Sequence, residues 1–181
     1  TVFLSAFTTK LAIYALARGF PGTGILIVIG LVMTLFPIFF AVIENDLRRV
    51  LGYSMINQIG FMVTGIGIGT ALSLNGAVAH AFNDVLFKGL LFLAVAGVIL
   101  RTGTRNMYET GGLIKKMPAS FISVLIGIIA LSGVPPLAGF GGKWLIYGAL
   151  IENGWYLQTG VAFFAASGFL ADRVDRSHDG D

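Results

Sequence analysis

Three ionisable side chains, His80, Asp84 and Lys88, stand four residues apart in the stretch AHAFNDVLFKG. This stretch lies within a largely apolar run from Leu72 to Leu100, and the pitch of a helix places all three on one face. An imidazole, a carboxylate and an amine on one face could pass protons through intervening water, which would explain costly charges in hydrocarbon. The spacing therefore predicts a proton path. The alternative is an ion pair of Asp84 with Lys88, and His80 as a hydrogen-bonded core residue.

Two further lysines lie in other apolar segments. Lys10 is near the middle of the first segment, far from the lipid headgroups at either end. The alternative to a role in proton transfer is that Lys10 is paired structurally with a carboxylate elsewhere. Lys143 lies in the fifth segment. Three charged lysines in one small bundle repel each other, which is a physical basis for stepwise proton transfer. We therefore expect Lys10, His80, Asp84, Lys88 and Lys143 to form a proton pathway.

The segment that carries Lys143 contains a helix-breaking stretch, SGVPPLAGFGGKW. Pro135 and Pro136 lack backbone donors and the following glycines weaken a helix, so we expect a break over residues 135–142. Counted from Ala119, this break falls at membrane depth, where irregular backbone must be buried in protein or line a water-filled cavity. Broken helices form ion sites in transporters, and we expect Lys143 to face such a cavity. The alternative is an extramembrane turn between two short helices.

The composition predicts a membrane protein. Hydrophobic residues make up 56% of the 181 residues and charged residues 12%, about half the charged fraction of a soluble domain. No strand pattern or nucleotide-binding glycine loop is visible, so the expected fold is an all-α, polytopic membrane bundle of about six transmembrane helices. Residues 172–181 are expected to be a disordered cytoplasmic tail. The six expected segments are about 2–18, 23–43, 47–69, 72–100, 119–151 and 155–171.

The basic residues are distributed unevenly between the two sides of this predicted bundle. The positive-inside rule places the side richer in Lys and Arg, with the N-terminal end and the tail, in the cytoplasm. This pattern accounts for the net charge of +3 without nucleic-acid binding. One side carries Arg18, and the other carries Arg48, Arg49, Arg101, Arg105, Lys115, Lys116, Arg173 and Arg176.

The sequence does not favour an enzyme. The chain has no cysteine, which excludes thiolate metal sites, and no nucleophile–base pair or cofactor loop is recognisable, so no cofactor and no metal are expected. Ser54, Asn57 and Gln58 are expected to make helix–helix hydrogen bonds. A series of alternate glycines, at 65, 67 and 69, is expected to allow close helix packing.

Five ordered motifs carry a family resemblance over about residues 5–150. In this order and spacing they resemble the antiporter-like subunits of the complex I and Mrp superfamily, most of all the D-type subunits of Mrp sodium/proton antiporters. The chain begins at Thr1 with apolar sequence, and it looks like a piece of a longer polypeptide. The motifs are TTKLAIYALAR, ENDLRRVLGYSMINQIGFM, AHAFNDVLFKGLLFLAVAGVIL, GGLIKKMP and SGVPPLAGFGGKWLI.

The resemblance implies a fold and residue roles. The family fold has about fourteen helices in two inverted repeats, each with one broken helix, and this chain would correspond to its second half. By resemblance, Lys10 links the two half-channels, His80 and Lys88 form the central relay, and Lys143 is the terminal lysine on the broken helix. The glutamate–lysine pair of the first half-channel would precede Thr1.

The expected function is that of a proton-translocating subunit of a monovalent cation (Na+)/H+ antiporter in the bacterial plasma membrane. Its expected partners are other membrane subunits, the lipid bilayer, protons and a monovalent cation. The sequence leaves two alternatives open: a proton-pumping membrane subunit of complex I or of a membrane-bound hydrogenase, and a non-conducting scaffold subunit. The same intramembrane residues would serve either transport function, so they do not separate the two.

Overall fold

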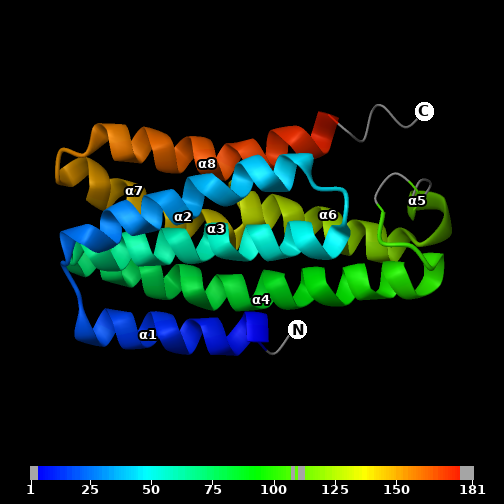
Figure 1. Cartoon of the computed structure of the whole chain (residues 1–181), viewed down its shortest axis with the longest axis horizontal. Coiled ribbons are helices and arrows are strands. Elements are labelled where there is room, and N and C mark those ends of the chain that lie inside the picture. The colour runs from blue at the N-terminus through cyan, green and yellow to red at the C-terminus, as the bar shows by residue number, and fades with distance from the viewer. Residues whose placement is uncertain (1–3, 107–108, 110–112, 176–181) are drawn as a thin grey trace.

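The structure, a computed structural model, describes residues 4–106, 109 and 113–175. These residues form an elongated helical bundle without strands, apart from one isolated bridge between Asp46 and Asn106, so the all-α prediction is confirmed (Figure 1). The elements are a π-helix η1 (Leu4–Thr8) and the α-helices α1 (Thr9–Gly19), α2 (Gly24–Ile43), α3 (Leu47–Ile68), α4 (Ala71–Thr102), α5 (Leu113–Lys116), α6 (Pro118–Ser132), α7 (Ala138–Glu152) and α8 (Tyr156–Asp175).

Local signals in the sequence set the ends of the two long central helices. The Asp46 side chain accepts a hydrogen bond from the Arg48 amide at 2.8 Å and caps the start of α3. Gly69, with a φ of +74°, ends α3 in the left-handed conformation that glycine adopts without strain. The Thr70 side chain then caps α4 by accepting from the Ser73 amide. The two helices are therefore joined by a tight, defined turn.

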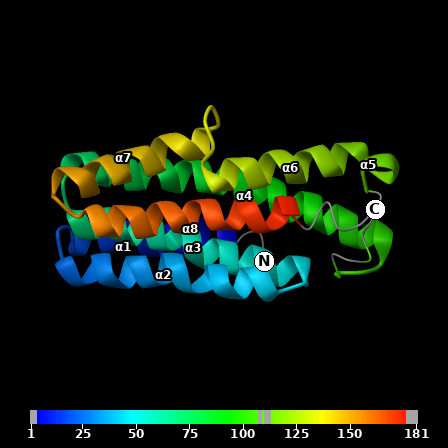
Figure 2. The same cartoon turned by 90° about the horizontal axis from the view of Figure 1, so that it is seen from above.

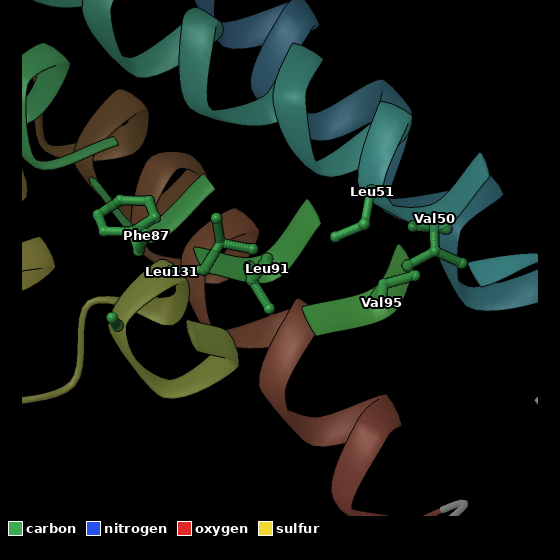
Figure 3. Packing of buried hydrophobic residues seen from close by; sticks show 8 residues of the cluster. Val50, Leu51, Phe87, Leu91, Val95 and Leu131 are labelled. Atoms are coloured by element: carbon green, nitrogen blue, oxygen red, sulfur yellow. The ribbon is translucent and has the colours of Figure 1, made fainter. Parts of the chain in front are cut away.

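Helix α4 lies at the centre of the arrangement. It packs against α3 on one side and against α6 and α7, which follow one another along it, on another (Figures 1 and 2). Helices α2 and α3 form a closely packed antiparallel pair, and α8 packs along α2. A buried apolar cluster joins α3, α4 and α6 and includes the labelled residues Val50, Leu51, Phe87, Leu91, Val95 and Leu131 (Figure 3).

Glycines allow α2 and α3 to approach each other closely. A Cβ atom at Gly60 would lie 2.7 Å from both the Gly30 carbonyl oxygen and the Thr34 amide nitrogen. A Cβ atom at Gly67 would lie 2.8 Å from the backbone nitrogen of Ile27. Small residues at such positions are the usual means of close helix packing in membranes. The packing role that the sequence predicted for the glycine series is confirmed at Gly67.

The predicted break in the fifth segment is present but shifted. Helix α6 ends at Ser132, Gly133 adopts a φ of +76°, and α7 begins at Ala138. The non-helical stretch is therefore 133–137 and not 135–142. Two adjacent prolines cannot donate helical hydrogen bonds, whereas a glycine inside a helix costs only about 1 kcal/mol. The glycines that follow the prolines therefore lie within α7.

Within the first expected segment, Leu4–Thr8 form the π-helix η1 and the α-helix starts at Thr9. One other expected boundary differs from the structure. Helix α8 continues to Asp175, so residues 172–175 of the expected disordered tail are helical. Residues 176–181 of that tail lie outside the described part of the chain.

The bundle exposes large apolar side chains and buries ionisable ones beside its apolar clusters. Large apolar side chains are exposed along the outer faces of α2 and α4, among them Val32, Phe36, Phe82 and Leu93, while ionisable side chains are buried. Soluble proteins do not expose contiguous apolar faces of this kind. By length and composition, α2 and α4 could each cross a membrane, whereas α6 and α7, at 15 residues each, are shorter than a full span.

The contact between α2 and α3 yields a stability prediction. Gly60→Ala places a methyl group against backbone atoms that cannot rotate away, so it should lower the free energy of unfolding by about 1–3 kcal/mol. Detergent titration of the complete subunit, followed by circular dichroism, would measure this change. Gly52→Ala, on the same helix, is the matched control, because a Cβ atom at Gly52 would meet nothing within 4 Å. Equal stability of the two variants would contradict the packing interpretation.

Candidate functional site

The five residues of the predicted proton pathway come from three helices. Lys10 lies on α1, the three spaced residues on α4, and Lys143 on α7. His80, Asp84 and Lys88 are fully buried, and Lys143 is 1% exposed. Burial of ionisable groups inside a bundle with an apolar exterior requires specific partners for each of them.

Asp84 is paired with Lys10 of α1 through an ion pair between its Oδ2 and the lysine Nζ. The alternative pair between Asp84 and Lys88 is not formed, because the Lys88 ammonium instead donates to Ser54 Oγ on α3 at 2.6 Å. Asp84 and Lys88 thus contact different helices and not each other. Lys10 also borders a cavity of about 170 Å³ between α1, α3 and α4, whose lining is apolar apart from Lys10 and Tyr14. Asp84 consequently ties α4 to α1, and Lys88 ties it to α3.

The carbonyl of Leu131 is the key feature at the break. In an uninterrupted helix it would accept from the backbone nitrogen of residue 135, but Pro135 has no N–H. Lys143 Nζ donates to this oxygen at 2.7 Å, and Gln58 Nε2 approaches it at 3.3 Å. The C-terminal end of α6 carries partial negative charge, which favours an ammonium group there. A carbonyl left unpaired by proline thus becomes the binding partner of a buried lysine.

The surroundings of Lys143 differ from the expected open cavity. Its ammonium lies 4.8 Å from the centroid of the Phe61 ring, in cation–π geometry, and against the Leu131 carbonyl. The side chain is enclosed by protein, so the expectation that Lys143 faces an open water-filled cavity is wrong. The irregular stretch itself is not buried in this chain, since Pro135 and Pro136 are exposed and Gly133, Val134 and Leu137 are half-buried.

His80 is connected to the same carbonyl through Gln58. His80 Nε2 lies 2.9 Å from Gln58 Oε1, and the amide nitrogen of Gln58 contacts Leu131 O. Sequence reasoning expected only helix–helix hydrogen bonds from Ser54 and Gln58 and did not link them to the ionisable residues. Ser54 and Gln58 are four residues apart, like the ionisable residues on α4, and this shared spacing was the sequence signal that could have linked the two sets.

Two glycines of α7 bring its backbone against the other helices of the site. A Cβ atom at Gly142 would lie 2.7 Å from His80 Cβ and 2.8 Å from His80 Cα and N. A Cβ atom at Gly139 would collide with the Ala130 carbonyl oxygen, whereas one at Gly141 would meet nothing within 4 Å. The residue directly after Gly142 is Lys143. Close contact of α7 with α4 therefore fixes the position of Lys143 along the bundle relative to His80.

The arrangement is chemically suited to proton transfer. It contains an amine–carboxylate pair, an amine on a hydroxyl, and an imidazole joined through an amide and a carbonyl to a third amine. Each of the amines, the carboxylate and the imidazole can hold a proton, and each contacts a polar neighbour from another helix. Asp84 Oδ1 and His80 Nδ1 are buried without a hydrogen-bond partner among the described atoms, so both are open to a further donor.

Comparison with known proteins places this geometry in context. The family model for the transmembrane region of the NADH:quinone oxidoreductase/Mrp antiporter matches residues 1–169. Formate hydrogenlyase subunit 3 of Escherichia coli is 37% identical over 151 residues, covering 77% of this chain and 24% of the relative. The D-type subunit of a Na(+)/H(+) antiporter of Alkalihalophilus pseudofirmus is 37% identical over 164 residues, covering 85% and 33%.

A solved structure shares the fold. The structure of the membrane-bound sulfane sulfur reductase, an archaeal respiratory membrane complex, contains a chain that superposes with a TM-score of 0.89 at 28% identity. The match covers 97% of this chain and 38% of that chain. The present chain thus spans between about a quarter and two fifths of the length of the proteins it matches.

The ion pair between Lys10 and Asp84 can be tested by stability. Asp84→Asn leaves the partly buried Lys10 ammonium without its carboxylate, so the free energy of unfolding should fall by up to about 3–5 kcal/mol. Lys10→Met combined with Asp84→Asn removes both charges and should restore most of this loss. Detergent titration of the complete subunit gives both values.

A matched control comes from the exposed pair of Arg49 and Glu44, whose nitrogen and oxygen lie 3.4 Å apart. Glu44→Gln should cost at most about 1 kcal/mol because water screens that pair. A double variant as unstable as Asp84→Asn alone would show that the Lys10–Asp84 pair is not the source of the loss.

Proposed function

Because the chain belongs to the NADH:quinone oxidoreductase/Mrp antiporter transmembrane family, we propose that it forms part of a proton-translocating membrane subunit. The resemblance predicted from the motifs is confirmed, and the chain is an antiporter-like membrane protein. In the proposed function, protons are carried by Lys10, His80, Asp84, Lys88 and Lys143.

The observation that carries the proposal is the pairing of the buried lysines. Lys88 and Lys143 are held by a hydroxyl and a carbonyl, and no described carboxylate lies within ion-pair distance of either. An amine held by neutral dipoles can gain or lose a proton without breaking an ion pair. A purely structural role would be better served by the Lys10–Asp84 type of contact, in which each charge is compensated. The two remaining lysines are therefore suited to carrying protons.

We further propose that the complete subunit exchanges protons for a monovalent cation, with sodium as the first candidate. Support comes from the 37% identity to a relative named as a subunit of a Na(+)/H(+) antiporter. A second candidate function is proton pumping driven by a redox reaction, because equal identity is found to formate hydrogenlyase subunit 3. Both candidates would use the same buried groups, so only a transport measurement distinguishes them.

The proposed setting is a complex with other membrane subunits in the bacterial plasma membrane. Arg48 and Arg49 lie at the start of α3, Arg101 lies in the last turn of α4, and Arg105 lies in the loop after α4. The loops before α3 and after α4 are joined by the Asp46–Asn106 bridge and by a hydrogen bond from Leu47 N to Arg105 O. These four arginines thus share one end of the bundle. In the proposed orientation this end faces the cytoplasm, together with the N-terminal end of the chain and its tail.

Lys143→Ala tests the proposal directly. In inverted vesicles that contain the complete subunit with its neighbouring subunits, addition of sodium should collapse a preformed pH gradient, measured by a pH-sensitive dye. The rate with Lys143→Ala should fall to that of vesicles without the subunit, because the group at the helix break can no longer carry a proton. Lys116→Ala is the matched control: that side chain is exposed on α5, and its loss should leave the rate unchanged.

The other outcomes separate the candidate functions. If sodium has no effect on the wild-type vesicles but an electron donor generates a gradient, the redox-driven function replaces the antiporter function. If neither stimulus acts and Lys143→Ala fails to assemble on native gels, the buried charges serve only to dock helices, and the protein is a scaffold subunit.

A further inference from the structure

Gln58 is a buried amide, 2% exposed, between the imidazole of α4 and the break between α6 and α7. Its nitrogen Nε2 lies 3.1 Å from Asn57 Oδ1 and 3.3 Å from the Leu131 carbonyl oxygen. Its oxygen Oε1 lies 2.9 Å from His80 Nε2. All three polar contacts of this amide are therefore made inside the protein.

The neighbours of Gln58 determine which way round its amide stands. Asn57 Nδ2 donates to the Thr34 carbonyl at 2.6 Å, so Asn57 must present its oxygen to Gln58. Both groups that face Gln58 Nε2 are then acceptors, and together they take the two hydrogens that this nitrogen carries. The reversed amide would bring its oxygen against two acceptor oxygens and would leave Asn57 Oδ1 without the donor that Gln58 supplies. The orientation follows from these hydrogen bonds, with Oε1 directed at His80.

The orientation of Gln58 in turn determines where the neutral imidazole carries its hydrogen. Because Gln58 Oε1 can only accept, His80 Nε2 must donate, and in neutral imidazole the other nitrogen is then the acceptor. That nitrogen, Nδ1, is buried and has no partner among the described atoms. A proton that reaches His80 can consequently bind only at Nδ1.

We propose that Gln58 is a positioning residue that holds His80 as the Nε2–H tautomer and thereby makes Nδ1 the proton-accepting atom of the pathway. This role in transport rests on the proposed function. Its consequence is that proton transfer to and from His80 takes place on one side of the ring only. The contact through Gln58 links His80 mechanically to the Leu131 carbonyl and Lys143, but it does not conduct protons while the amide keeps its orientation. Protons enter and leave His80 on the opposite side of the ring.

Ionisable groups of two helices lie near this imidazole. Asp84 follows His80 by one turn on α4, and Lys143 directly follows Gly142, whose backbone packs against His80. The Phe61 ring stands edge-on to the imidazole at 6.0 Å between centroids, and the same ring lies over the Lys143 ammonium. Gln58 thus fixes one nitrogen of a ring that packs among ionisable residues of the proposed pathway.

Nitrogen-15 NMR of the complete subunit in membranes tests this assignment, with label in histidine and the His80 signals identified by subtracting the spectrum of His80→Asn. The wild type should give one set of signals, with a hydrogen on Nε2, a bare Nδ1, and an Nε2–H proton resonance shifted downfield by its hydrogen bond. In Gln58→Leu that resonance should move upfield, and signals of the Nδ1–H tautomer should appear.

Ser54→Ala is the matched control for the spectrum, because Ser54 lies one turn earlier on α3 and contacts Lys88 and not the imidazole. It should leave the His80 signals unchanged. If Gln58→Leu does not assemble, Asn57→Ala, which removes one of the two acceptors that orient Gln58, should produce the same changes in weaker form.

A wild-type spectrum with the hydrogen on Nδ1 would overturn the proposal, and so would a Gln58→Leu spectrum identical to that of the wild type. A wild-type subunit that shows the Nε2–H tautomer but moves no protons in the vesicle assay would overturn the proposed function and would leave the tautomer assignment intact.

Discussion

A single backbone carbonyl, that of Leu131, constrains the arrangement of the site. Pro135 removes its helical donor, and a buried carbonyl must be paired by another group. Lys143 and Gln58 supply the donors, and both must reach the same oxygen from different helices. The Leu131 side chain is at the same time fixed in the apolar cluster between α3, α4 and α6. The position of the broken helix is thus held both by packing and by the polar groups that it organises.

The second principle of the structure is that apolar side chains cover the exterior while the ionisable side chains of the site are buried. In water, charged groups are placed outside because their solvation there is favourable; in lipid the interior of the bundle is the more polar medium. Each buried charge therefore joins two helices: Asp84 joins α4 to α1, Lys88 joins α4 to α3, and Lys143 joins α7 to α6. The contacts that hold the bundle together are made by the same side chains that the proposed function uses for protons.

The sequence predicts those properties that depend on local pattern or on composition. The helical class, the break near two prolines and the burial of His80, Asp84 and Lys88 all follow from periodicity and from the cost of charge in hydrocarbon. The partner of Asp84 could not be read in this way. Lys88, four residues away, was the obvious candidate, yet the ion pair joins residues 74 positions apart because α1 packs beside α4. The role of Gln58 was equally hidden, since only the folded chain shows that its amide lies between an imidazole and a carbonyl.

Helix α4 is unbroken over 32 residues, although it borders a helix that is interrupted. A continuous helix behaves as a stiff rod, so the contacts of Lys88 with Ser54, of Asp84 with Lys10 and of His80 with Gln58 are attached to one rigid body. Any sliding or rotation of α4 therefore changes all three contacts at once. The three contacts along α4 are thus coupled mechanically, and a movement of this helix would form or break them together.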